Sequence, residues 1–226
     1  MRRNFFNQLA MIMRSFVPVA RTRGVARTAH LALSELWFDP SHGTDTSLEF
    51  AEPHGSHSPS HPSHAACNPV IFRELMANVP LRKDASGFLD LGSGKGRALL
   101  LAEMCGFRWI IGVETDPRLI LIAEQNVAGA RRRGRGRRGS ITVHSGNAAR
   151  FTIPDTVNVI FLYNPFGPEI IDQVIDRIGE SAQRSPRAIF VVYQNARYLD
   201  RFVTRGFSSR YSQGVDGSVL AFEVAH

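Results

Sequence analysis

The chain has 226 residues, with 27 Lys and Arg against 20 Asp and Glu, a formal charge of +7 and 43% hydrophobic residues. This length fits one α/β domain with an accessory segment and is short for two complete domains. Charged residues interrupt the longest apolar stretches before they reach the ~20 residues of a membrane-spanning helix. The two cysteines, Cys67 and Cys105, form no C-x-x-C pair, so a disulfide framework and a four-thiolate zinc site have no support. The expected compartment is the cytosol.

The positive charge is concentrated in two short segments. Residues 1–34 hold six arginines and no acidic residue, and residues 129–140 hold six more, again without an acid. An interaction with nucleic acid is therefore a property of these segments and not of the rest of the chain. Genome composition is an alternative explanation for the arginines, because Lys83 and Lys95 are the only lysines.

The N-terminal residues 1–38 form a basic segment with a helical pattern. Four large apolar residues recur at spacings of four, three and four: Phe5, Leu9, Ile12 and Phe16. They predict an apolar face on a helix that ends before Pro18. Such a face packs on its own domain, lies on a membrane surface, or belongs to an Arg-rich transit peptide. Packing on its own domain is the commonest of these outcomes.

Residues 39–66 are rich in Gly, Ser, Pro and His and show no apolar periodicity, which predicts a loop or lid. Four histidines lie in this segment: His54, His57, His61 and His64. Pro59 and Pro62 prevent a helix from gathering these imidazoles on one face, and no acidic or thiolate ligand lies between them. We therefore expect a solvated segment and no metal.

After residue 67, short apolar runs alternate with helical periods, which indicates βαβ units and a mostly parallel sheet. The expected strands are 87–91, 109–114, 140–144, 157–162, 188–194, 207–211 and 218–224. One expected helix begins at Asn68-Pro69. Four more cover 95–105, 117–128, 169–183 and 198–204. The last two strands flank a turn at 214–217 and predict an antiparallel hairpin. The fold class is thus α/β: a Rossmann-like, seven-stranded, mostly parallel sheet with a C-terminal antiparallel hairpin and helices on both faces.

A glycine-rich segment, Asp90-Leu91-Gly92-Ser93-Gly94-Lys95-Gly96-Arg97, lies where the first expected strand turns into a helix. Doubly wound sheets bind nucleotide-like ligands at this turn, because glycines admit the ligand and the helix N-terminus presents free N–H groups. A phosphate-binding P-loop does not fit, because Gly96 follows the lysine where Ser or Thr is needed. A dinucleotide-binding G-x-G-x-x-G does not fit either, because its last position needs a small residue and holds Arg97.

The remaining pattern, D-x-G-x-G-x-G, resembles the first motif of class I S-adenosylmethionine-dependent methyltransferases. The second strand ends in Glu114, about twenty residues after the glycines, where an acid accepts hydrogen bonds from ribose hydroxyls. Ser145-Gly146-Asn147-Ala148 follows the third strand and is similar to the family's adenine-binding turn.

The resemblance covers residues 67–226 and implies S-adenosyl-L-methionine as the cofactor. It assigns Glu114 to the ribose, and Asn147 and Ala148 to the adenine. The residues that it assigns to the methionine part are Asp90, Gly92, Ser93, Gly94 and Gly96.

The fourth expected strand runs into Asn164-Pro165-Phe166, which resembles a shortened form of the Asn-Pro-Pro-Tyr/Phe motif of amino-group methyltransferases. In that family this position faces the methyl group. The Asn164 amide carbonyl and the Pro165 main-chain carbonyl can accept hydrogen bonds from a substrate N–H, and Phe166 can stack on a planar or cationic group. These residues are the candidate catalytic residues. A turn that only ends a buried strand is the alternative for Asn-Pro.

The chain is also similar to a bacterial group of small methyltransferases with a basic N-terminal helix. The shared stretches are 38–39, 43–46, 90–97, 112–114 and 164–166. This likeness implies that the N-terminal helix is part of the enzyme, which counts against a cleaved transit peptide. It also implies that Asp45 and Thr46 belong to a lid over the cofactor, although a loop could use them as plain turn residues.

The leading hypothesis is an S-adenosylmethionine-dependent methyltransferase that transfers a methyl group to an amino or amide nitrogen by in-line displacement. Its acceptor would be a small molecule or a protein amino group. The alternative is a nucleic-acid-binding protein on a methyltransferase-like scaffold, with 131–138 holding phosphates. No aromatic residues lie within 131–138 to stack bases, which favours a solvated insertion there. Peripheral membrane contact through 5–16 is compatible with the enzyme hypothesis.

Overall fold

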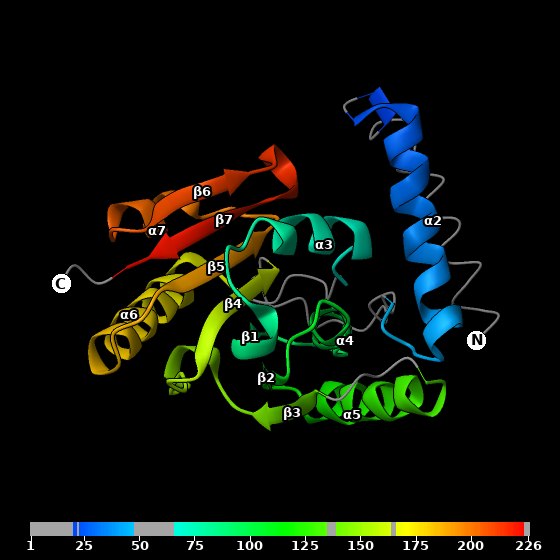
Figure 1. The fold of residues 1–226 in the computed structure, drawn as a ribbon, viewed down its shortest axis with the longest axis horizontal. Helices are drawn as coiled ribbons and strands as arrows, with labels where there is room; N and C mark the ends of the chain where they lie inside the picture. The colour runs from blue at the N-terminus through cyan, green and yellow to red at the C-terminus, as the bar shows by residue number, and fades with distance from the viewer. Residues whose placement is uncertain (1–19, 22, 48–65, 135–138, 164–165, 224–226) are drawn as a thin grey trace, which may run out of the picture.

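The computed structural model describes residues 20–21, 23–47, 66–134, 139–163 and 166–223. Within them, seven strands form one sheet in the order β3-β2-β1-β4-β5-β7-β6 (Figure 1). The strands are β1 Gly87–Leu91, β2 Trp109–Glu114, β3 Ser140–Ser145, β4 Val157–Tyr163, β5 Ile189–Gln194, β6 Ser208–Ser212 and β7 Gly217–Phe222. β1 to β5 pair in parallel, while β7 is antiparallel to both β5 and β6. The predicted fold class is confirmed.

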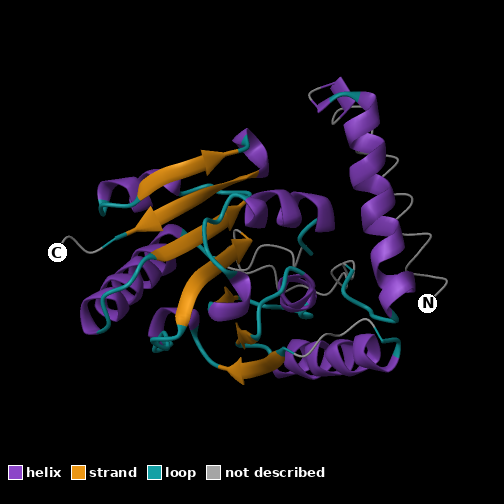
Figure 2. Cartoon of the chain, viewed as in Figure 1, coloured by secondary structure: helices purple, strands orange, loops and turns teal. Residues whose placement is uncertain are grey.

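The helices after residue 67 are close to the predicted ranges, whereas no range was predicted for the long helix that precedes them. Figure 2 shows the helices around the sheet. They are α2 Val25–His42, α3 Pro69–Ala77, α4 Arg97–Met104, α5 Pro117–Arg132, α6 Pro168–Arg184 and α7 Leu199–Thr204. Short 3-10 turns are η1 Lys83–Ala85, η2 Ala148–Arg150 and η3 Gly214–Asp216. Among the described residues, no helix combines the length and the apolar character needed to cross a membrane.

The prediction of a loop from residue 39 onward was wrong for its first four residues. Asp39, Pro40, Ser41 and His42 are the last turn of α2, which ends at Gly43. Gly43 has φ +70°, a conformation that glycine adopts without strain, and its N–H bonds to the Asp39 carbonyl at 2.8 Å. α5 is also longer than predicted, because the helix continues through Arg131 and Arg132 of the Arg-rich segment.

Two apolar clusters cover the two faces of the sheet. Successive strand residues point to opposite faces, so Phe88 and Phe161 belong to one cluster, while Leu89 and Ile160 belong to the other. The first cluster includes side chains of α2, α3, α4 and α5, and the second those of α6 and α7. β1 is buried along its whole length, as expected for a central parallel strand covered on both faces.

Asn68 starts α3 and also joins it to α2. Its side-chain carbonyl accepts a hydrogen bond from the Val70 N–H at 3.0 Å, with Pro69 at the first helical position. Its amide nitrogen donates to the Leu31 carbonyl at 3.0 Å, and the Ser34 hydroxyl donates to its carbonyl at 3.2 Å. α2 is thereby fixed to the domain at the point where the catalytic region was predicted to begin.

The strand order reverses between β1 and β4, because β2 and β3 lie on one side of β1 and β5, β7 and β6 lie beyond β4. In open α/β sheets, ligands bind outside the carboxyl ends of the strands at such a switch point. The predicted cofactor and catalytic motifs follow the carboxyl ends of β1, β2, β3 and β4, so the topology brings them to one edge of the sheet.

Candidate active site

The glycine-rich loop is tied to the end of β2. The N–H groups of Gly92 and Ser93 both donate to the Val113 carbonyl, at 2.9 and 3.0 Å. Gly94 has φ +51° and a Cβ there would meet nothing within 4 Å, so the loop is open above this residue. Gly112 on β2 makes the close approach possible, because a Cβ would lie 2.8 Å from the Ser93 hydroxyl oxygen. The Gly of the Gly-Val-Glu motif is therefore a packing requirement of the loop.

Glu114 is buried at the carboxyl end of β2, directly beneath the glycine-rich loop. Its Oε2 accepts a hydrogen bond from the Gly94 N–H at 2.9 Å. Its Oε1 accepts from the N–H groups of Thr115 at 2.7 Å and Asp116 at 3.0 Å. A carboxylate oxygen can accept about two hydrogen bonds, so Oε2 retains one position for a ligand hydroxyl.

Asp90 is buried at the end of β1, next to Glu114 on the neighbouring strand. No described residue donates a hydrogen bond to its carboxylate. Burial raises the pKa of Asp90 to about 8, and the negative charge of Glu114 adds to this effect. The Ser93 hydroxyl is also buried without a hydrogen-bond partner among the described residues. Buried polar groups without partners are costly, and in a loop of this kind they indicate groups that bind a ligand.

The remaining predicted site residues have different surroundings. Asn147 is exposed and caps η2, because its side-chain carbonyl accepts the Ala149 N–H at 2.9 Å, while Ala148 is buried. Their assignment to the adenine stays a prediction. Phe166 is half-buried and packs against the apolar cluster that includes α6. Asn164 and Pro165 lie outside the described residues.

A buried arginine joins the glycine-rich loop to α2. Arg97, the first residue of α4, forms ion pairs with Glu35 and Asp39, and its Nε donates to the Thr46 hydroxyl at 2.6 Å. The guanidinium also lies 5.1 Å from the centre of the Phe38 ring. The sequence pattern placed Arg97 in the glycine-rich motif and did not reveal this role.

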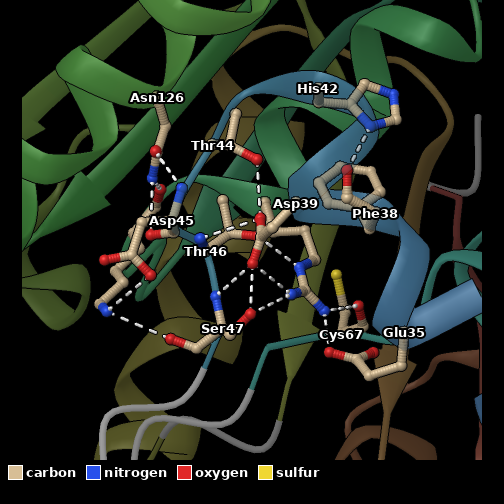
Figure 3. A network of polar contacts seen from close by, with 12 residues as sticks. Glu35, Phe38, Asp39, His42, Thr44, Asp45, Thr46, Ser47, Cys67 and Asn126 are labelled. Carbon is tan, nitrogen blue, oxygen red and sulfur yellow. Dashed lines mark hydrogen bonds and ion pairs between the residues drawn. The ribbon is translucent and has the colours of Figure 1, made fainter. Parts of the chain in front are cut away.

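Asp39 is the acceptor at the centre of the same network, which Figure 3 shows. The residues that donate to its carboxylate from the chain just beyond α2 are Thr44, Thr46 and Ser47. Burial alone would raise the pKa of Asp39, but Arg97 and these hydroxyls outweigh it and hold the pKa below its usual range.

The segment after α2 also contacts the glycine-rich loop and α5 directly. Lys95 Nζ donates to the Ser47 carbonyl at 3.1 Å and lies 3.8 Å from the Asp45 carboxylate. Asn126 of α5 accepts the Asp45 N–H at 2.7 Å, and its amide nitrogen donates to the Asp45 carbonyl at 3.0 Å and the Lys95 carbonyl at 2.9 Å (Figure 3). Residues 44–47 are thus held beside the loop, the place that a lid would need. That they close over a cofactor stays a prediction.

The charges of this site fit a cationic nucleoside better than a nucleotide. Glu114 presents a negative charge that would repel a phosphate, and Asp90, whose raised pKa keeps it protonated in the free protein, would ionise beside a bound cation. The lysine that a P-loop directs at phosphate instead holds Ser47 and Asp45. S-adenosyl-L-methionine carries a sulfonium, an ammonium group and ribose hydroxyls, so the residues present fit it.

The other predicted ligand sites are covered only in part. His54, His57, His61 and His64 lie outside the described residues, and no group of three metal-binding side chains occurs within them. In the Arg-rich segment, Arg131 donates to the Gly139 carbonyl at 2.9 Å, and Arg133 donates to the Pro40 carbonyl at 2.8 Å. These two side chains bind the protein's own backbone.

No family model and no curated protein matches this chain. Many solved structures share its fold. A candidate S-adenosyl-L-methionine-dependent methyltransferase from Methanococcus maripaludis superposes with a TM-score of 0.53 at 12% identity, over 69% of this chain and 84% of that one. A predicted N6-adenine-specific DNA methylase from Listeria monocytogenes gives 0.53 at 19% identity, over 71% of this chain and 52% of that one.

The tRNA (uracil-54, C5)-methyltransferase of Pyrococcus abyssi, in complex with S-adenosyl-L-homocysteine, gives a TM-score of 0.48 at 15% identity. It is matched over 69% of this chain and 37% of its own length. The present chain thus spans about half of the Listeria protein and just over a third of the Pyrococcus protein. It has the seven-stranded Rossmann-like fold of the S-adenosylmethionine-dependent methyltransferases.

Proposed function

We propose that this chain is an S-adenosyl-L-methionine-dependent methyltransferase that acts on an amino or amide nitrogen. The observation that carries the proposal is the pair of buried carboxylates at the ends of β1 and β2, with an open glycine-rich loop hydrogen-bonded to the second of them, Glu114. One carboxylate, Asp90, has no hydrogen-bond donor among the described residues, and the other, Glu114, retains an acceptor position. Together they suit a cation that also presents hydroxyl groups.

Each part of the loop has a role in holding the cofactor. Asp90 would accept from the ammonium group, and the free N–H groups that begin α4 would bind the carboxylate of the methionine part. Glu114 Oε2 would accept a ribose hydroxyl, and Ala148 would pack against the adenine beside Asn147. The cofactor supplies an activated methyl group on a sulfonium, so the protein has to position the acceptor and exclude water.

The acceptor side of the site follows β4. Tyr163 is the last residue of this strand, and burial raises its pKa to about 12, with smaller contributions from Cys67 and Glu35. Its hydroxyl therefore stays protonated at neutral pH and can donate a hydrogen bond. Asn164 and Pro165 would accept hydrogen bonds from the acceptor N–H and direct the nitrogen lone pair at the methyl group. Phe166 would stack on the acceptor. A small molecule or a protein amino group suits these contacts.

The proposal is tested by titrating the protein with S-adenosyl-L-homocysteine. We expect Glu114→Ala to weaken binding at least about tenfold, because it removes a charged acceptor and the anchor of the Gly94 N–H. Glu180→Ala is the matched control, since this glutamate lies exposed on α6 in a pair with Arg177. Equal affinity for wild type and Glu114→Ala would remove the ribose assignment, and no binding to the wild type would remove the proposed cofactor.

A further inference from the structure

The outward side of α2 is apolar except for one exposed histidine, His30. Three of its side chains are among the most exposed large apolar residues of the described chain: Val25 at 66%, Leu33 at 65% and Trp37 at 72% exposed. The smaller or half-buried residues beside them are Ala26, Ala29, Ala32, Leu36 and Pro40. Among the exposed residues of 25–40, His30 is the one polar side chain, and no Lys, Arg, Asp or Glu is exposed there. A solvent-facing helix surface normally carries charges, so this face indicates a binding surface.

α2 cannot bury this face by rotating, because its opposite side is held by polar contacts. Arg27 pairs with Glu74 of α3 at 2.8 Å. Farther along the helix, Glu35 and Asp39 pair with the buried Arg97. The outward face therefore needs another element to cover it.

We propose that residues 5–16 of this same chain form a helix that packs on the outward face of α2. These residues lie outside the described part of the chain, and their sequence predicts an apolar helix face. Such a helix would end before Pro18, and residues 18–24, of which 20, 21 and 23 are helical, would connect it to α2. Helix–helix connections of this length are ordinary in proteins. Gly24, with φ +80°, separates α2 from the helical residues that precede it.

The two faces are complementary in length and in size. Phe5 to Phe16 extends ~16 Å along a helix axis, and Val25 to Trp37 extends ~18 Å, at 1.5 Å per residue. The N-terminal face carries large side chains, whereas the middle of the α2 face carries alanines, which let a second helix approach closely. Large residues against small ones pack without voids, as helix pairs require.

The other possible occupants fit less well. A membrane surface would attract unpaired arginines, but Arg23 and Arg27 at this end of α2 are already paired with Asp216 and Glu74. A second copy of the chain would have to compete with a segment tethered a few residues away, whose effective concentration is in the millimolar range. Both alternatives are outcomes of the test below.

Trp37 reports on this face directly. The chain has two tryptophans, so Trp109→Phe leaves Trp37 as the single tryptophan of the full-length protein, and excitation at a wavelength that tyrosine does not absorb reports on it alone. We expect a blue-shifted emission and weak quenching by acrylamide. Changing the four residues of the N-terminal face to serine should red-shift the emission and raise the quenching constant about twofold. The residues changed are Phe5, Leu9, Ile12 and Phe16.

The control for this test changes Asn7 and Arg14 to serine, because both lie on the opposite face of the predicted helix, and it should leave the fluorescence unchanged. Three results would overturn the proposal. In the first, acrylamide quenches Trp37 of the full-length chain as efficiently as an exposed tryptophan. In the second, Trp37 is protected from acrylamide only in a dimer seen by sedimentation. In the third, it is protected only after vesicles of phosphatidylcholine and phosphatidylglycerol are added.

A second variant keeps the proposal testable if the serine variant fails to fold. Ala29→Glu places a charge in the middle of the outward face without touching the core. We expect trypsin to cleave after Arg14 about tenfold faster in this variant than in the wild type, because the displaced segment opens more often. An unchanged cleavage rate would contradict the proposal.

Discussion

Replacing Arg97 with alanine is expected to lower the free energy of unfolding by about 3–5 kcal/mol. Arg97 is 3% exposed and pairs with both Glu35 and Asp39. Removing the guanidinium leaves the two carboxylates without their cation, and it also removes the hydrogen bond to Thr46 that helps to hold residues 44–47. The loss is measured by urea unfolding at pH 7, followed by circular dichroism.

Arg82→Ala is the matched control for this prediction. Arg82 also pairs with an aspartate, Asp84 at 3.0 Å, but both side chains are exposed to solvent. We expect this variant to unfold at the same urea concentration as the wild type, because exposed ion pairs add little to stability. A loss for Arg97→Ala no larger than that for Arg82→Ala would show that the buried network does not hold α2 and residues 44–47 to the domain.

Asp90→Asn is expected to change ligand binding and stability in opposite directions. In the proposed site this carboxylate binds the ammonium group, so the variant should bind S-adenosyl-L-homocysteine at least about tenfold more weakly. The wild type should release about one proton per ligand at pH 7, because the pKa of Asp90 is about 8 in the free protein and the bound ammonium group stabilises the ionised form. The variant should release none. Titrations in buffers of different ionisation enthalpy measure this number.

Asp90→Asn is expected to stabilise the free protein, although it weakens ligand binding. The pKa of Asp90 is about 8 in the folded state, above the ~3.9 of an unfolded chain, so the folded state retains a proton that the unfolded state has lost. The contribution of Asp90 therefore falls as the pH rises from about 4 to 8. Above pH 8 we expect Asp90→Asn to be more stable than the wild type by roughly 2 kcal/mol. If the difference in the free energy of unfolding between the two proteins stays constant from pH 4 to pH 9, the buried, unpaired state of this carboxylate is contradicted.

The fold could be predicted well because its signals are local. Strands β1, β2, β4 and β5 are predominantly apolar runs, and α3 and α5 begin with a capping residue followed by proline. The glycine-rich loop and Glu114 could be located for the same reason, since their spacing along two successive strands determines where they meet.

The network around Arg97 could not be predicted from local pattern, because its members are far apart in the sequence. Glu35 and Asp39 lie on α2, and they meet Arg97 only after α2 has packed across α3. Asp39, a polar residue directly before Pro40, also resembled the start of a loop. In the structure its carboxylate is buried and accepts hydrogen bonds from the hydroxyls of Thr44 and Thr46. The one sequence signal for this contact was that the stretches 38–39, 43–46 and 90–97 occur together in the bacterial group that the chain resembles.

A crystal structure of the protein grown with S-adenosyl-L-homocysteine would show whether Asp90 and Glu114 hold the nucleoside. We expect electron density for the nucleoside over the glycine-rich loop, with the amino group at Asp90 and a ribose hydroxyl at Glu114 Oε2. Density for the compound elsewhere, or the loop free of ligand at saturating concentration, would contradict the claim that these two carboxylates form a methyl-donor site.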